Sequence, residues 1–278
     1  MTLYSRITFL FAITLLFNVK GQDIDLSFFK EQEKILQDEY QQIISTTDES
    51  KIPILQEKFF NHFFEVVKNE NSWLYSFDSL KNVGKVHSPN GKMIVYTWNF
   101  SKLFGYSDYF GILQYVGKKG KEVQTYRLQM LKETVEDPFL YICDTNKWIG
   151  ALYYDIVETK YKGTECYTLI GYNLNNVLSN KKVLDAICVG KSGNLRFEPN
   201  MFYYHKKVCN RIEFEYAENA QMLLMYKPEM ERIVFDHLSP IRPSLEGQYQ
   251  FYGPDASYDA FYFEDGVWRL ESNILIKN

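Results

Sequence analysis

The densest group of side chains that could do acid–base or ligand-binding chemistry lies between residues 236 and 262 of this 278-residue chain. Its possible proton-transfer groups, which are candidate catalytic residues, are Asp236, His237, Asp255 and Asp259. Its candidate ligand-binding residues are Arg242, Tyr252, Tyr258 and Tyr262. Tyrosine rings can stack on sugar faces, while one carboxyl group acts as an acid and another as a base or nucleophile. The group could therefore form a sugar-binding or hydrolytic cleft.

The same residues also suit ordinary turn and strand positions. Asp236 and His237 end an expected strand, where short polar side chains bond the turn backbone. Asp255 follows Gly-Pro in a turn that favours an aspartate, and Asp259 alternates with apolar neighbours. We favour this structural interpretation over catalysis. Oxygen atoms of Asp255 and Asp259 could also bind Ca²⁺, but we predict neither a metal nor a cofactor.

Well-marked catalytic motifs are absent from the sequence. It contains no G-x-S-x-G elbow, Walker phosphate loop, H-E-x-x-H helix, EF-hand loop or Gly-rich dinucleotide fingerprint. Glycosidases carry no short signature, so a hydrolase with paired carboxylates stays open as an alternative. Lys and Arg number 31 against 35 Asp and Glu, which gives a net charge of −4 and argues against a nucleic-acid partner.

Amphipathic periodicity predicts two helices near the N-terminus. A first apolar stripe recurs at helical spacings in Phe28, Ile35, Leu36, Tyr40 and Ile43. The polar segment 46–50 and Pro53 suit the start of a new helix. A second apolar stripe follows in Leu55, Phe59, Phe63, Val66 and Val67. We therefore expect a helical hairpin over residues 22–75, with His62 at its rim rather than bound to a metal.

From residue 92 onward the apolar pattern alternates, as it does in β-strands. About thirteen strand-like segments are joined by short turns rich in Gly, Asn and Asp. Such turns cannot hold crossover helices, so each strand should pair antiparallel with its sequence neighbour. Glu213, Glu215 and Glu218 alternate with apolar residues, which predicts a solvated strand face.

These elements predict an α+β fold in which the helical hairpin packs on a large antiparallel β-meander over residues 92–278. So many strands exceed one open sheet, so we expect a sandwich or a partly closed barrel. No Pro- or Ser-rich linker separates the helices from the strands, which favours a single domain over residues 22–278.

The first 21 residues have the layout of a secretory signal peptide. Arg6 precedes an apolar run over residues 7–17, and Val19-Lys20-Gly21 suits cleavage before Gln22. A retained membrane anchor is the alternative, but the run is shorter than the roughly 20 residues that a spanning helix needs. The sequence therefore predicts a periplasmic or secreted protein, with no membrane span after cleavage.

Export permits disulfide bonds among the four cysteines. They are Cys143, Cys166, Cys188 and Cys209, which can form two bonds in three ways. Two disulfides, one disulfide and buried free thiols all remain open, because each cysteine lies in or beside an apolar segment. The chain contains no C-x-x-C motif, so a redox or zinc site of that type is not indicated.

Several segments of the chain carry a resemblance to a known family. They are RIVFDHLSP (232–240), SLEGQY (244–249) and YGPDASYDAF (252–261), with DSLK (78–81), YTWN (96–99) and WIGALYY (148–154) earlier in the chain. Together they resemble a family of uncharacterised exported proteins of Bacteroidetes-type bacteria. The resemblance covers most of the chain after the predicted signal peptide. It implies export, and it implies no activity because none is assigned to the family.

We expect from the sequence an exported binding or envelope-associated protein without catalytic activity, whose partner is an unknown ligand or envelope component. A ligand cleft between the helical hairpin and the sheet would support this expectation. The alternative is a hydrolase acting on glycan or another envelope polymer, which needs two carboxylates in one groove at roughly 5 to 10 Å. A purely structural role would require an exposed apolar patch without a pocket. Whether the protein is an enzyme, and its oligomeric state, stay open.

Overall fold

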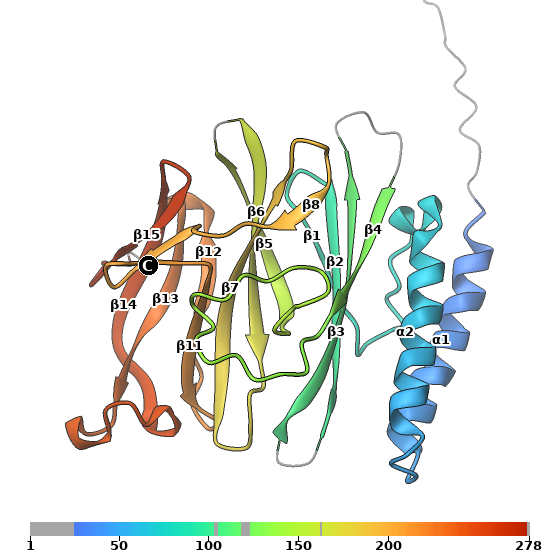
Figure 1. Cartoon of the computed structure of the whole chain (residues 1–278), viewed down its shortest axis with the longest axis horizontal. Coiled ribbons are helices and arrows are strands. Elements are labelled where there is room, and N and C mark those ends of the chain that lie inside the picture. Colours follow the sequence, from blue (N-terminus) through green and yellow to red (C-terminus); the bar gives the residue numbers. More distant parts are fainter. Residues whose placement is uncertain (1–24, 103–104, 118–122, 162, 277–278) are drawn as a thin grey trace, which may run out of the picture.

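The chain folds into a helical hairpin and three stacked β-sheets, which form four layers (Figure 1). A computed structural model describes residues 25–102, 105–117, 123–161 and 163–276. The predicted signal peptide, residues 1–21, lies outside the described residues. The predicted α+β class is confirmed, since two helices precede many antiparallel strands.

The predicted helical hairpin is confirmed as α1 (Ser27–Ser45) and α2 (Ile52–Lys68). The buried apolar residues of α1 are Phe29, Leu36 and Ile43. Leu36 and Ile43 belong to the predicted stripe, whereas Phe29 is buried in place of its predicted neighbour Phe28. Phe28 and Ile35 are exposed, because a helix that packs on only one face buries a narrow stripe. His62 lies at the rim of the hairpin, where its ring nitrogens contact the side chains of Glu39 and Gln32.

The first sheet carries the hairpin on one face. Its strands, in spatial order, are β1 (Gly84–His87), β2 (Met93–Ser101), β3 (Ser107–Val116) and β4 (Val123–Gln129). A 3-10 turn, η1 (Glu70–Leu74), leads out of α2. Aromatic rings fill the space between α2 and the sheet, among them Phe59, Phe60, Phe63, Trp98 and Phe110. This interface is therefore a solid core. A cleft between the hairpin and the sheet would have supported a binding function, and the solid core found there weakens that hypothesis.

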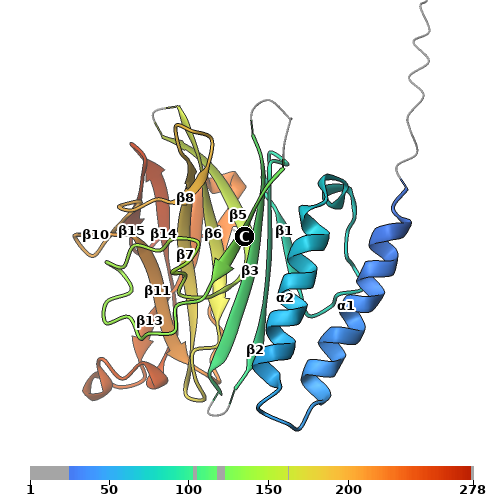
Figure 2. The same ribbon diagram turned by 45° about the vertical axis from the view of Figure 1, so that its right-hand side comes forward.

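The second sheet lies at the centre of the stack and is covered on both faces (Figure 2). Its strands are β5 (Leu152–Tyr161), β6 (Thr164–Asn173), β7 (Ser179–Val189), β8 (Leu195–Phe197) and β11 (Arg211–Ala217). The order is β11-β7-β6-β5, with β8 paired to β7. Because both faces are covered, β6 and β7 contain nearly continuous buried runs.

The third sheet closes the other side of the stack. Its strands, in spatial order, are β10 (Lys207–Cys209), β9 (Phe202–Tyr204), β15 (Val267–Glu271), β14 (Tyr252–Glu264), β13 (Arg232–Pro240) and β12 (Leu224–Lys227). The 3-10 turns η3 (Pro228–Met230), η4 (Pro243–Leu245) and η5 (Tyr249–Phe251) join them. A mainly apolar core, rich in aromatic rings, separates this sheet from the second one.

The meander prediction holds for most strands and fails at two pairings. β11 pairs with β7 across an intervening segment, and β9 pairs parallel with β15. Short turns decide which strands form hairpins, but packing decides which sheet edges meet. The described strands form three open sheets rather than a barrel. Two of the strand-like segments of the alternating region, 139–143 and 248–252, are not strands, apart from Tyr252 at the start of β14.

One of the open cysteine arrangements is present. Cys166 of β6 and Cys188 of β7 are directly opposite each other on neighbouring strands of the central sheet and form a disulfide. Cys143 and Cys209 are buried free thiols. The disulfide therefore joins the two middle strands of the most covered sheet.

Candidate functional site

His237 and Asp259, two of the predicted catalytic residues, lie side by side on the third sheet. His237 occupies a bulge in β13, and its Nδ1 lies 2.8 Å from Asp259 Oδ2. Asp259 is buried in β14, and its Oδ1 accepts a hydrogen bond of 2.9 Å from the Asn273 backbone N–H. The pair resembles the carboxylate–imidazole arrangement that orients a histidine in many sites.

The other two catalytic candidates make local backbone contacts. Asp236 Oδ2 accepts a 2.6 Å hydrogen bond from the Leu223 backbone N–H. Asp255 Oδ1 accepts hydrogen bonds from the hydroxyl and backbone N–H of Ser257, at 2.6 and 3.0 Å. These bonds lower the pKa of Asp255, to which the nearby His237 adds a smaller effect. The structure therefore brings Asp255 near the His237–Asp259 pair, while Asp236 ties β13 to the segment before β12.

The ligand-binding candidates are spread over a loop and a strand. Arg242 is exposed in the loop between β13 and β14, and the Tyr252 hydroxyl accepts a hydrogen bond from the Gly247 backbone N–H. Tyr258 and Tyr262 stand in β14 opposite Asp236 and Arg232 of β13. None of the eight candidates lines either of the two hollows described below. In the described part of the chain these residues do not form a cleft.

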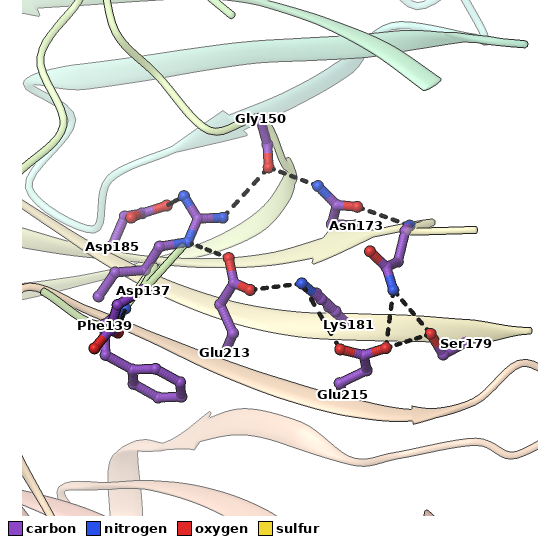
Figure 3. Close-up of polar contacts among 11 residues, drawn as sticks. Asp137, Phe139, Gly150, Asn173, Ser179, Lys181, Asp185, Glu213 and Glu215 are labelled. Atoms are coloured by element: carbon purple, nitrogen blue, oxygen red, sulfur yellow. Dashed lines mark hydrogen bonds and ion pairs between the residues drawn. The ribbon is translucent and has the colours of Figure 1, made fainter. Parts of the chain in front are cut away.

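A row of buried and partly buried charges crosses the central sheet, and the sequence analysis missed it (Figure 3). Arg211 lies between two carboxylates, 3.2 Å from Asp185 and 3.0 Å from Glu213. Lys181 continues the row, 2.9 Å from Glu213 and 3.8 Å from Glu215. We call these five residues the charge ladder. The prediction of a solvated face was wrong for Glu213, which is buried, because β11 pairs with the Lys181 and Asp185 strand, far away in sequence.

The end of the charge ladder at Asp185 is closed to solvent. Tyr153 donates a 2.6 Å hydrogen bond to Asp185, and Trp148 donates one of 2.9 Å to the Tyr153 hydroxyl. Burial raises the pKa of Asp185, although Arg211 opposes this shift. The hollow beside Arg211 and Cys143 has a volume of about 10 Å³, which is about the space of one water molecule. This end of the charge ladder is therefore too enclosed to hold anything larger than a water molecule.

An open groove of about 480 Å³ lies where the first and second sheets meet. It lies between their two edge strands, β1 and β5. Its lining consists of Lys81, Asn82, Gly84, Thr97, Leu152, Tyr153, Tyr154, Tyr172 and Lys182. We call it the edge groove. It has apolar and aromatic walls, two lysines and no acidic residue in its described lining.

Strand pairing and a β-bulge arrange the walls of the edge groove. Leu152, Tyr172 and Lys182 form one row across β5, β6 and β7. The pairing of β5 with β6 shifts at Tyr154, which reorients that side chain. The Tyr154 hydroxyl then donates a 2.7 Å hydrogen bond to the Leu224 backbone carbonyl of the third sheet. The Tyr154 side chain is thus fixed by its backbone in β5 and by the hydrogen bond of its hydroxyl.

Lys182 is the unusual group of the edge groove. Its ammonium nitrogen lies 4.5 Å from the ring centre of Tyr154 and 5.4 Å from that of Tyr172. Burial lowers its pKa from the ordinary value of 10.5. Among the described residues no carboxylate forms an ion pair with Lys182, whereas the adjacent Lys181 points to the opposite face and belongs to the charge ladder. The edge groove therefore holds a partly buried cation that lacks a counter-ion.

Sequence reasoning did not find the edge groove. Its residues come from a loop and five strands, so no local spacing joins them. The one available signal is the Lys181-Lys182 pair next to the apolar end of a strand, because it places one lysine on each face of that strand. No family model matches the chain, and comparison with curated proteins and with solved structures finds no similar one.

Proposed function

We propose that the protein is an exported binding protein that holds its ligand in the edge groove without catalysing a reaction. The observation that carries the proposal is the edge groove itself, with aromatic and apolar walls and few polar groups. This composition is typical of small-molecule sites. Its described lining lacks histidine, cysteine and carboxylates, so it offers no ordinary acid–base pair or activated nucleophile.

Two observations support export. The N-terminal sequence predicts a signal peptide, and the Cys166–Cys188 disulfide is typical of proteins outside the reducing cytosol. No helix within the described ranges is long and apolar enough to cross a bilayer. The resemblance to exported proteins of Bacteroidetes-type bacteria agrees with this proposal but is an independent prediction.

Blocking the edge groove should abolish ligand binding. We expect small-molecule fragments, including neutral sugars, acidic sugars and aromatic acids, to shift the backbone NMR signals of Gly84, Thr97 and residues 152–154. Asn82→Trp, which adds a large side chain at the exposed rim, should weaken such binding about tenfold or more. Asn219→Trp, at another exposed position outside the lining, is the matched control. Fragment shifts that cluster elsewhere, or binding that survives Asn82→Trp, would contradict the proposed site.

A hydrolase acting on an envelope glycan is the second candidate function. The His237–Asp259 pair favours it, because an oriented imidazole beside two carboxylates can transfer protons. Both Asp259 oxygens and one Asp255 oxygen already accept hydrogen bonds from the protein, which favours the binding proposal.

The hydrolase candidate has a direct test. If purified protein releases reducing ends from an envelope glycan, Asp255→Ala and Asp259→Ala should each lower the rate about a hundredfold or more. The control is Asp265→Ala, in an exposed hairpin turn of the same sheet. Hydrolysis that persists unchanged in both variants would remove these two residues as the catalytic pair.

A further inference from the structure

We propose that the edge groove recognises a carboxylate attached to a ring, with Lys182 as the group that binds the carboxylate. This inference rests on the proposed binding function and adds the chemical class of the ligand. A uronic-acid sugar and an aromatic carboxylic acid both present the required chemistry, and the test below treats them separately.

The first step of the argument concerns the charge of Lys182. A partly buried ammonium group loses hydration, and the usual compensation is a carboxylate within ion-pair distance. Two other partly buried lysines have one, since Lys181 pairs with Glu213 and Lys92 pairs with Glu165. Lys85 of β1 has none in the described chain, but its ammonium donates a 2.7 Å hydrogen bond to the Tyr75 backbone carbonyl. Lys182 has the faces of Tyr154 and Tyr172 instead. Cation–π contacts compensate only in part, so an anion from outside would complete the site.

The second step concerns position. The Tyr154 hydroxyl is held by its hydrogen bond to the Leu224 carbonyl, and the backbone of Tyr172 is held by strand pairing on both sides. The two rings therefore fix where the Lys182 ammonium lies, and little rearrangement is needed on binding. Lys81, at the exposed rim, adds a second positive charge and has no ion-pair partner in the described chain. Charge complementarity thus points to an anion.

The third step concerns the rest of the ligand. Leu152 and the tyrosine rings form an apolar wall next to Lys182, while Asn82 and Lys81 supply polar contacts at the rim. The edge groove is open along one side, which suits a ring or a short chain of rings rather than an alkyl tail that needs enclosure. A ring that stacks on the wall and carries a carboxylate satisfies both the apolar surface and the ammonium group.

The test measures calorimetric affinity of the whole chain for trigalacturonate, a neutral trisaccharide of matched size, and 4-hydroxyphenylacetate. At least one of the two acids should bind about tenfold more tightly than the neutral sugar, and Lys182→Met should remove that difference. Lys182→Arg should retain it, because it keeps the charge. Lys227→Met, at a partly exposed strand lysine of β12 outside the lining, should leave every affinity unchanged.

The pH dependence provides a second readout. The carboxylate needs a protonated Lys182, so affinity should fall as pH rises through its lowered pKa, below 10.5, and should fall less in Lys182→Arg. The other titratable groups facing this site are Lys81, Tyr153, Tyr154, Tyr172 and Tyr216. Burial raises the pKa of all four tyrosines, so they remain neutral over this range.

The outcomes separate this inference from the proposed function. Lys182→Met should unfold at the same urea concentration as the wild type or higher, since it removes a desolvated charge, and this shows that loss of binding is not loss of fold. If the neutral sugar binds in the edge groove as tightly as both acids, the groove binds ligands but recognition of a carboxylate is wrong. If no compound binds there, the proposed function fails as well.

Discussion

Replacing Arg211 with methionine is expected to lower the free energy of unfolding by about 3–5 kcal/mol, the cost of leaving buried charges without a partner. Arg211 is the cation between Asp185 and Glu213, and all three side chains are almost fully buried. Methionine fills similar space but leaves two carboxylates that cannot reach water. Urea unfolding followed by tryptophan fluorescence measures the change, because Trp148 is buried and joined to Asp185 through Tyr153.

The matched control for Arg211→Met is Arg196→Met. Arg196 also forms an ion pair, 2.9 Å from Glu198, but its side chain is 65% exposed. The exposed pair should contribute less than about 1 kcal/mol. Equal costs at both positions would show that the charge ladder is hydrated, contrary to the enclosed geometry described above. A cost at Arg211 alone would show that the charge ladder fixes β11 against β7.

Replacing Phe63 with alanine is expected to cost about 3–5 kcal/mol, because it leaves a cavity among closely packed rings. The Phe63 ring centre lies 5.3 Å from that of Tyr96, 5.4 Å from that of Phe77 and 5.7 Å from that of Trp98. These rings join α2 to the first sheet. The same unfolding measurement applies, with near-ultraviolet circular dichroism reporting the loss of aromatic packing.

Phe28→Ala serves as the control, since Phe28 is 45% exposed on the neighbouring helix. It should cost less than about 1 kcal/mol. Ligand affinity in the edge groove should not change in folded Phe63→Ala protein, because no residue of the hairpin lines it. A small cost for Phe63→Ala would mean that the helices pack loosely on the sheet, and would contradict the solid core.

Local patterns in the sequence predicted the elements that depend on local forces. Helical spacing identified α1 and α2, although the buried face of α1 runs through Phe29 rather than Phe28, since both residues are apolar and adjacent. Turns such as Glu264-Asp265-Gly266 correctly separated β14 from β15. In each case a short stretch of chain contains both the signal and its cause.

Long-range pairing could not be predicted in the same way. Glu213 alternates with apolar residues whether its face meets water or a partner strand with Lys181, so burial depends on the pairing of β11 with β7. The edge groove depends on two sheet edges meeting, which no turn encodes. By contrast, proximity of His237 to Asp259 was suggested by their shared cluster, and the structure does bring them together. Their proposed catalytic role remains a hypothesis.

The disulfide has a consequence for the chemistry of Lys182. Cys166 is opposite Cys188 in the same register that places Tyr172 opposite Lys182. Tyr172 follows Cys166 by six residues in β6, and Lys182 precedes Cys188 by six residues in β7. If the pairing of β6 with β7 shifted by one residue, Lys182 would face the other side of the sheet. The disulfide between these two strands prevents that shift. Reduction of the disulfide would remove this constraint, so the proposed export to an oxidising compartment would also preserve the position of Lys182 in the edge groove.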